Sequence, residues 1–149
     1  MSELSNAVHA ARDVAFMDHW SSQPIPDESW NTYVTGPSFV GELSFVAFGT
    51  EPDGSEHVVG FIMSSVNEQD WAAAGYRSSY IGLVGVLSGW RGRHIAQALL
   101  ATQLATSRAA GHERATLDVD SASPTGALGL YTGMGFFPTN RELAFVLEF

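Results

Sequence analysis

The stretch SYIGLVGVLSGWRGRHIAQALL, residues 79–100, decides the fold. Its first part, residues 79–88, is apolar and rich in valine, leucine and isoleucine, which predicts a strand, and a helix is expected over about residues 94–110. Arg91 and Arg93 flank a glycine at the turn between them. A helix that begins here exposes unpaired N–H groups and the positive end of its dipole, which favours an anion such as phosphate. The alternative is an ordinary helix start with two solvated arginines.

The rest of the sequence predicts a single α/β domain, residues 1–149, with a mixed sheet. Apolar periodicity and turn residues give the expected elements. Helices are expected at 6–20, 27–36 and 123–135, and strands at 43–50, 57–66, 114–121 and 142–149, with a long loop at 67–78. Because a helix joins the strands at 79–88 and 114–121, these two strands should be parallel.

Composition excludes several classes of function. The net charge of −9 argues against a nucleic-acid partner. All seven basic residues are arginines, which excludes Schiff-base chemistry and a Walker-type phosphate loop. There is no cysteine, and the five histidines are scattered without metal-ligand spacing, so no metal is predicted. No apolar run is long enough to cross a membrane, and no signal peptide is evident, so a cytoplasmic location is expected.

Two glycines, Gly82 and Gly85, lie inside the expected strand that precedes the arginines. Glycine weakens a strand interior and often marks a bulge or the close approach of a ligand. Ligands of sheets with parallel strands bind outside the carboxyl ends of those strands. Both points favour a binding site at the junction over a plain turn.

The segment GVLSGWRGRHIAQALL resembles the acetyl-CoA signature of the GCN5-related N-acetyltransferases (GNAT), Gln/Arg-x-x-Gly-x-Gly/Ala. A later segment, LDVDSASPTGALGLYTGMGFFP, is similar to that family's second motif, which contains Leu-Tyr and then Gly-Phe. His94 stands where the family has glycine, and Ser123 where it has asparagine. The family's usual first strand has no counterpart before the helix at 6–20, which leaves one sheet edge to a partner strand or a homodimer. The chain also resembles the C-terminal half of two-domain, mycothiol synthase-like members.

The resemblance implies that acetyl-CoA is the co-substrate. Its pyrophosphate would bind the signature loop, and its pantetheine arm would pair with the preceding strand, which is expected to bulge and to separate from the strand at 114–121 at Gly85. The implied cofactor-binding residues are Val84, Gly85, Val86, Arg91, Gly92, Arg93, His94, Ile95, Ala96 and Ser123.

The resemblance further implies direct attack of an amine on the thioester, with Tyr131 of the Leu-Tyr pair as general acid. Packing of the short helix is the structural alternative for this tyrosine. The residues leave the general base open. Asp120 is the first choice, Asp118 shares its face of the strand, and water is a further option. Three other candidates are Glu56, His57 and Asp70.

The implied reaction is N-acetylation of a small-molecule amine, and the acidic composition favours a cationic acceptor. Acetylation of protein lysines or N-termini, and a non-catalytic acyl-CoA-binding module, are the alternatives. Acceptor specificity is expected from the first helices and from the segment at 67–78. Four aromatic residues are candidates for the wall of the acceptor pocket: Trp20, Trp30, Trp71 and Tyr76.

Overall fold

The computed structural model describes residues 2–17, 23–119, 127–140 and 147–148. The chain divides into two compact units, Met1–Asp118 and Val119–Phe149. The larger unit contains the sheet, the helices that cover it and the loop that follows the third strand.

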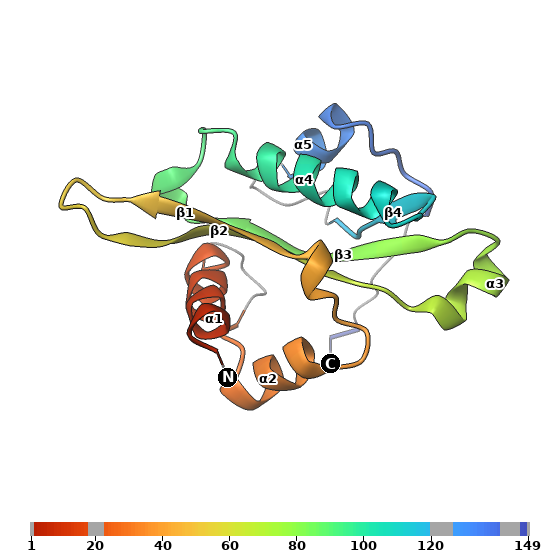
Figure 1. Ribbon diagram of the computed structural model, residues 1–149, viewed down its shortest axis with the longest axis horizontal. Coiled ribbons are helices and arrows are strands. Elements are labelled where there is room, and N and C mark those ends of the chain that lie inside the picture. The colour runs from red at the N-terminus through yellow and green to blue at the C-terminus, as the bar shows by residue number, and fades with distance from the viewer. Residues whose placement is uncertain (1, 18–22, 120–126, 141–146, 149) are drawn as a thin grey trace. The chain divides into compact units, whose positions relative to one another are not determined.

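A four-stranded mixed sheet forms the centre of the larger unit (Figure 1). Its strands, in spatial order, are β1 (Phe45–Thr50), β2 (Glu56–Ser65), β3 (Ser78–Val86) and β4 (Arg114–Thr116). The first two pairs are antiparallel, and β3 pairs with β4 in parallel. The predicted α/β class and the parallel pair are therefore confirmed.

Helices cover both faces of this sheet (Figure 1). The helices α1 (Glu3–Ala15) and α2 (Asp27–Thr35) lie on one face, and α4 (Ile95–Ala109) lies on the other. Phe61 and Met63 of β2 point toward the first face and pack in a core with Trp30 of α2. No strand precedes α1 among the described residues, and no described helix is long and apolar enough to cross a membrane.

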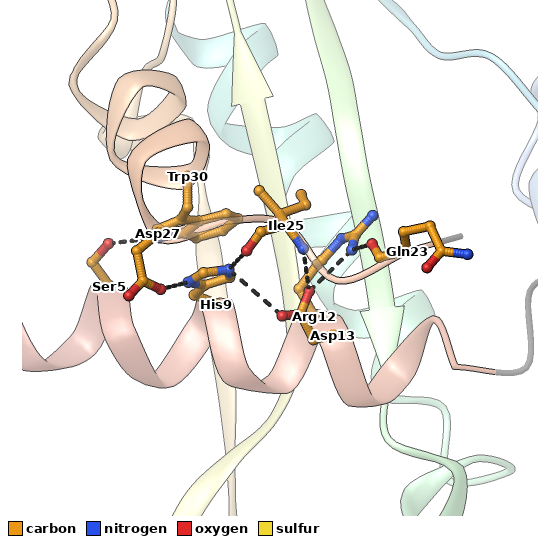
Figure 2. A network of polar contacts seen from close by, with 8 residues as sticks. All are labelled: Ser5, His9, Arg12, Asp13, Gln23, Ile25, Asp27 and Trp30. Carbon is orange, nitrogen blue, oxygen red and sulfur yellow. Dashed lines mark hydrogen bonds and ion pairs between the residues drawn. The ribbon is translucent and has the colours of Figure 1, made fainter. Parts of the chain in front are cut away.

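A polar network ties α1 to α2 (Figure 2). His9 is buried, its ring stacks on that of Trp30 with centroids 5.0 Å apart, and its Nε2 lies 2.6 Å from the carbonyl oxygen of Ile25. The indole N–H of Trp30 donates to Ser5 Oγ at 3.0 Å, and the N–H of Ile25 donates to Asp13 Oδ1 at 3.2 Å. The network fixes α2 and the segment before it against α1.

A second polar layer lies buried beneath α4. The amide of Gln103 donates to Ser64 Oγ of β2 and to Ser79 Oγ of β3, both at 3.3 Å. Ser79 also shares a 2.8 Å hydrogen bond with Ser107 of α4. Because a buried polar group is costly without its partners, these bonds specify where α4 sits along the sheet.

Two expected elements differ in the structure. The segment at 67–78, expected to be a loop, contains a 3₁₀ turn, Glu68–Asp70, and the short helix α3 (Trp71–Ala74). The strand expected at 114–121 is wrong in extent, since β4 ends at Thr116. Its pairing stops there because the chain turns away from β3 after Thr116. An alternating apolar pattern does not show at which residue a strand stops pairing.

The smaller unit contains α5 (Ala127–Gly133), which agrees with part of the helix expected at 123–135. Within this unit the rings of Tyr131 and Phe136 are in edge contact, with centroids 5.9 Å apart, and the N–H of Phe136 donates to the carbonyl of Tyr131 at 3.0 Å. Most of the strand expected at 142–149 falls outside the described residues.

Candidate functional site

The loop from β3 to α4 contains two residues in the left-handed backbone region. Gly92 has φ +79° and His94 has φ +62°, and no other described non-glycine residue has a positive φ. Histidine is among the residue types that tolerate this region, whereas a β-branched residue is not. Turns of this kind direct successive N–H groups inward and form concave sites that suit an anion.

The start of α4 has no side-chain cap. His94 occupies the N-cap position without making a capping hydrogen bond, and the first backbone bond of the helix runs from the N–H of Ala98 to the carbonyl of His94, at 3.1 Å. The preceding N–H groups, including those of Ile95 and Ala96, thus lie at the positive end of a helix of 15 residues. Backbone and dipole together suit a phosphate here.

Arg91 holds the loop to two neighbouring elements. Its Nε donates to the carbonyl of Val86 at the end of β3, and its Nη2 donates to the carbonyl of Ala15 at the end of α1, both at 3.1 Å. A cation is favourable at the carboxyl end of a helix, where unpaired carbonyls carry negative charge. The structure shows these two bonds of Arg91, and its predicted role as a phosphate ligand stays a prediction.

Arg93 lies over a tryptophan that the sequence analysis did not select. Its guanidinium is 4.5 Å from the centroid of the Trp90 ring, a cation–π distance. The Trp90 ring in turn lies against Gly49 of β1, where a Cβ would come within 2.6 Å of it. Trp90 therefore packs the loop onto β1 and supports Arg93. The signal in the sequence was Gly49, an interior strand glycine that gives the indole room.

Beyond Tyr80 and Thr116, β3 and β4 no longer pair. Val84 and Val86 pair with β2 and, among the described residues, with no other strand, so their role as partners of a pantetheine arm stays a prediction.

The bulge predicted at Gly85 is wrong. The register shift of β3 lies at Gly82, which has no partner on β2, and Gly85 pairs regularly with Phe61. A Cβ at Gly85 would lie 2.5 Å from Phe61 Cζ, so this position is glycine because an aromatic ring crosses it. Packing thus explains one of the two strand glycines.

The acid–base candidates are dispersed. Asp120 and Ser123 lie outside the described residues. Asp118 lies two residues beyond β4, and its Oδ2 accepts a 2.9 Å hydrogen bond from the hydroxyl of Tyr80. His57, at the start of β2, is in edge contact with Trp90, with ring centroids 6.0 Å apart. Asp70 belongs to the 3₁₀ turn before α3, and Glu56 is the first residue of β2.

The predicted aromatic wall does not form from the residues that the structure describes. Trp30 is fully buried in the core. The ring of Trp71 packs on His112, and Arg114 lies 4.0 Å over Tyr76. The last two contacts lie near the amino ends of β3 and β4, away from the loop that leads to α4. Trp20 lies outside the described residues.

Tyr131 belongs to α5 in the smaller unit. Burial raises the pKa of its hydroxyl above the ordinary value of 10.0, because burial disfavours the phenolate. The side chain therefore stays protonated throughout the neutral range. Among the described residues, no cluster of three or more histidine, aspartate or glutamate side chains could hold a metal ion.

The family model for the acetyltransferase (GNAT) family matches residues 6–136. The chain belongs to the GNAT acetyltransferase family. Its four-stranded mixed sheet with helices on both faces is the sheet arrangement of this GNAT fold, and the family predicted from the two sequence motifs is confirmed. No match was found among curated protein sequences.

Solved structures with the same fold include several GNAT proteins. The NatC complex bound to Gag peptide and CoA is 20% identical with a TM-score of 0.75, over 95% of this chain and 81% of that chain. An aminoglycoside acetyltransferase from an uncultured soil metagenomic sample, solved with trehalose, is 20% identical with a TM-score of 0.70, over 99% of this chain and 90% of that chain. A GCN5-related N-acetyltransferase from Sphaerobacter thermophilus is 30% identical with a TM-score of 0.66, over 90% of this chain and 38% of that chain.

Proposed function

We propose that this GNAT protein transfers the acetyl group of acetyl-CoA to a primary amine of a small molecule. The observation that carries the proposal is the uncapped start of α4, preceded by left-handed residues at positions 92 and 94 and placed directly after β3. A site of this kind suits the pyrophosphate of coenzyme A. Membership of an acetyltransferase family supports the same reading.

The residues of the loop would share the binding. Backbone N–H groups of residues 92–96 would bind the pyrophosphate, with a charge-assisted contribution from Arg93. Arg91 would hold the loop in place through its bonds to the carbonyls of Val86 and Ala15. The edge of β3 at Val84, Gly85 and Val86, which pairs with no other described residue, would receive the pantetheine arm. Ser123 would add a contact in the position of the family's asparagine.

The chemistry would need two proton transfers. The amine nitrogen forms a bond to the thioester carbonyl carbon, the carbon–sulfur bond breaks, and the departing thiolate accepts a proton from the Tyr131 hydroxyl. The raised pKa of Tyr131 supports this role because the acid stays protonated until needed. Asp120 would accept the proton that the ammonium must lose before attack.

The test is release of coenzyme A from acetyl-CoA with a panel of acceptors, followed by mass analysis of the product. The panel contains small primary amines, aminoglycosides, lysine peptides and free-N-terminus peptides. Turnover confined to small amines supports the proposal, and turnover confined to peptides contradicts it. Acetyl-CoA binding without turnover on any acceptor would instead make the chain a non-catalytic binding module.

A further inference from the structure

A buried polar layer lies between α4 and the sheet, and Gln103 is at its centre. Gln103, Ser64 and Ser79 are all fully buried. The side-chain N–H group of Gln103 donates to the hydroxyl oxygens of Ser64 on β2 and Ser79 on β3, each at 3.3 Å. Ser79 also shares a 2.8 Å hydrogen bond with Ser107 of α4. Side chains of α4 are therefore bonded to both β2 and β3.

The side chain of Gln103 keeps one polar atom without a partner. Its Oε1 is buried and accepts no hydrogen bond from the described residues. Turning the amide over would only exchange its two polar atoms, so either orientation leaves one of them unpaired. An unpaired buried polar atom costs about 1–3 kcal/mol, and an apolar side chain of similar size would avoid this cost. Stability alone therefore does not explain a glutamine at this position.

The start of α4 packs closely on β2 through apolar contacts. A Cβ at Gly60 would lie 2.9 Å from Ile95 Cγ2 and 3.2 Å from Leu99 Cδ1, so the missing side chain lets the helix approach the strand. Apolar contacts are non-directional, and they limit the distance between helix and sheet more than the position of the helix along its own axis. The hydrogen bonds of Gln103 are directional, so they restrict that axial position.

The axial position of α4 decides where the helix start lies relative to β3. Gln103 follows Ile95 within the same helix, at a distance of about 12 Å along the axis. Because a helix moves as one hydrogen-bonded element, a shift at Gln103 moves the helix start with it. The bonds to Ser64 and Ser79 therefore set the spacing between the helix start and the edge of β3, which are the two halves of the proposed cofactor site.

We propose that Gln103 is a positioning residue that fixes the spacing between the phosphate-binding start of α4 and the pantetheine-binding edge of β3, an inference that rests on the proposed function. Gln103 is buried beneath α4 and acts through the position of that helix. A ligand that spans two subsites gains affinity from both where their spacing matches its own length. Binding groups must lie within about 0.5 Å of the productive geometry, so a small slide of α4 removes that gain.

The experiment compares three ligands by titration. Acetyl-CoA spans both subsites, S-acetyl-pantetheine has the arm alone, and ADP has a pyrophosphate without the arm. The test variant combines Ser64→Ala with Gln103→Leu, which makes the pair apolar, while Ser79 keeps its bond to Ser107. Its melting temperature should be unchanged or higher. Its affinity for acetyl-CoA should fall about tenfold, and its affinities for the two fragments should stay within about twofold.

Two further variants separate positioning from packing. Leu100→Met changes a fully buried apolar side chain of α4 outside the polar layer, and as the matched control it should leave all three affinities within about twofold. Gln103→Met alone keeps an unbranched side chain and should show the same selective loss, which provides the test if the double variant does not fold. A purely structural role for Gln103 predicts a lower melting temperature without a selective loss of acetyl-CoA affinity.

The outcomes distinguish this inference from the proposed function. Unchanged acetyl-CoA affinity in the Gln103 variants overturns the inference even if the protein acetylates amines. Equal losses for acetyl-CoA and both fragments also overturn it, because the spacing is then not what changed. The selective loss, in a protein that turns over no acceptor, supports the role of Gln103 and contradicts the transfer reaction. If acetyl-CoA binds the parent protein no more tightly than its better fragment, no ligand spans the two subsites and the inference falls.

Discussion

His94 occupies the position where the GNAT signature has glycine, and its φ of +62° gives the physical reason for that glycine. The backbone at this turn is left-handed, which costs about 1–2 kcal/mol for most residues with a Cβ. The histidine N–H is still present, so the anion site does not depend on the side chain. The sequence showed that position 94 has histidine in place of the family's glycine. It did not show that the backbone at this position is left-handed.

His94→Gly is expected to raise the free energy of unfolding by about 0.5–1 kcal/mol, since relief of the left-handed strain exceeds the added entropy of glycine. Affinity for acetyl-CoA should stay within about tenfold of the parent. His94→Val is the contrasting variant and should destabilise by about 1 kcal/mol or more. Denaturant unfolding and titration measure both quantities, and a hundredfold gain of affinity in His94→Gly would show that histidine obstructs the site.

Tyr131→Phe is expected to lower kcat at least about tenfold, because it removes the proposed proton donor and keeps the ring. Affinity for acetyl-CoA should not change, which marks a loss confined to the transition state. Steady-state kinetics with a good amine acceptor measure both. Full activity in this variant would assign Tyr131 to packing against Phe136, the ring that it contacts.

The pH profile gives a second test of Tyr131. Since burial raises its pKa above 10.0, the acid form persists as pH rises through neutrality and is lost only above that value. Activity of the parent should therefore show no decline from this group below about pH 10. A tyrosine-dependent decline at lower pH, absent in Tyr131→Phe, would contradict the raised pKa.

Among the elements, β3 illustrates how far an interior glycine can be interpreted from sequence. Gly82 and Gly85 looked equivalent, yet Gly82 is the bulged residue and Gly85 lies beneath the ring of Phe61. The difference depends on a cross-strand partner 24 residues earlier, given by the register of β2 with β3. The residue pattern within β3 alone does not show that Phe61 of β2 lies opposite Gly85.

Gly85→Ala should lower the free energy of unfolding by about 1–3 kcal/mol, because the new methyl group collides with a buried ring. Combining it with Phe61→Leu should cost less than the sum of the two single changes. Chemical denaturation of the four proteins in this cycle measures the coupling. Additive losses would show that the ring does not require glycine at 85.

The two arginines of the signature should differ in their effects. Arg91→Ala removes the bonds to the ends of α1 and β3 and should destabilise the protein without ligand by about 1 kcal/mol. Arg93→Ala should leave stability within about 0.5 kcal/mol and should weaken acetyl-CoA binding. Thermal unfolding and titration separate these effects. Equal behaviour of the two variants in both measurements would contradict the division of roles.

At the scale of the whole molecule, the sequence predicted the mixed sheet, the parallel β3–β4 pair and the family. These follow from local signals such as the apolar run at 79–88, the helix that follows it and the turn residues. The site was less predictable, because Trp90 gains its position beneath Arg93 through its contact with Gly49 on β1. Sequence spacing shows which residues share an element, but not which elements meet.

The net charge of −9 makes the protein as a whole unfavourable to an anionic cofactor and favourable to a cationic acceptor. Recognition of acetyl-CoA must therefore be local. The uncapped helix start and the turn before it provide a local positive potential through the backbone, which does not depend on how many arginines the chain contains. Recognition of the phosphates at this turn is the central claim of the account.

Calorimetric titration of the parent protein with acetyl-CoA and with S-acetyl-pantetheine tests this claim most directly. The two ligands share the thioester arm, and only acetyl-CoA contains the pyrophosphate. We expect acetyl-CoA to bind at least about a hundredfold more tightly, as several charge-assisted bonds would provide. Equal affinity for the two ligands would contradict a phosphate site at the start of α4.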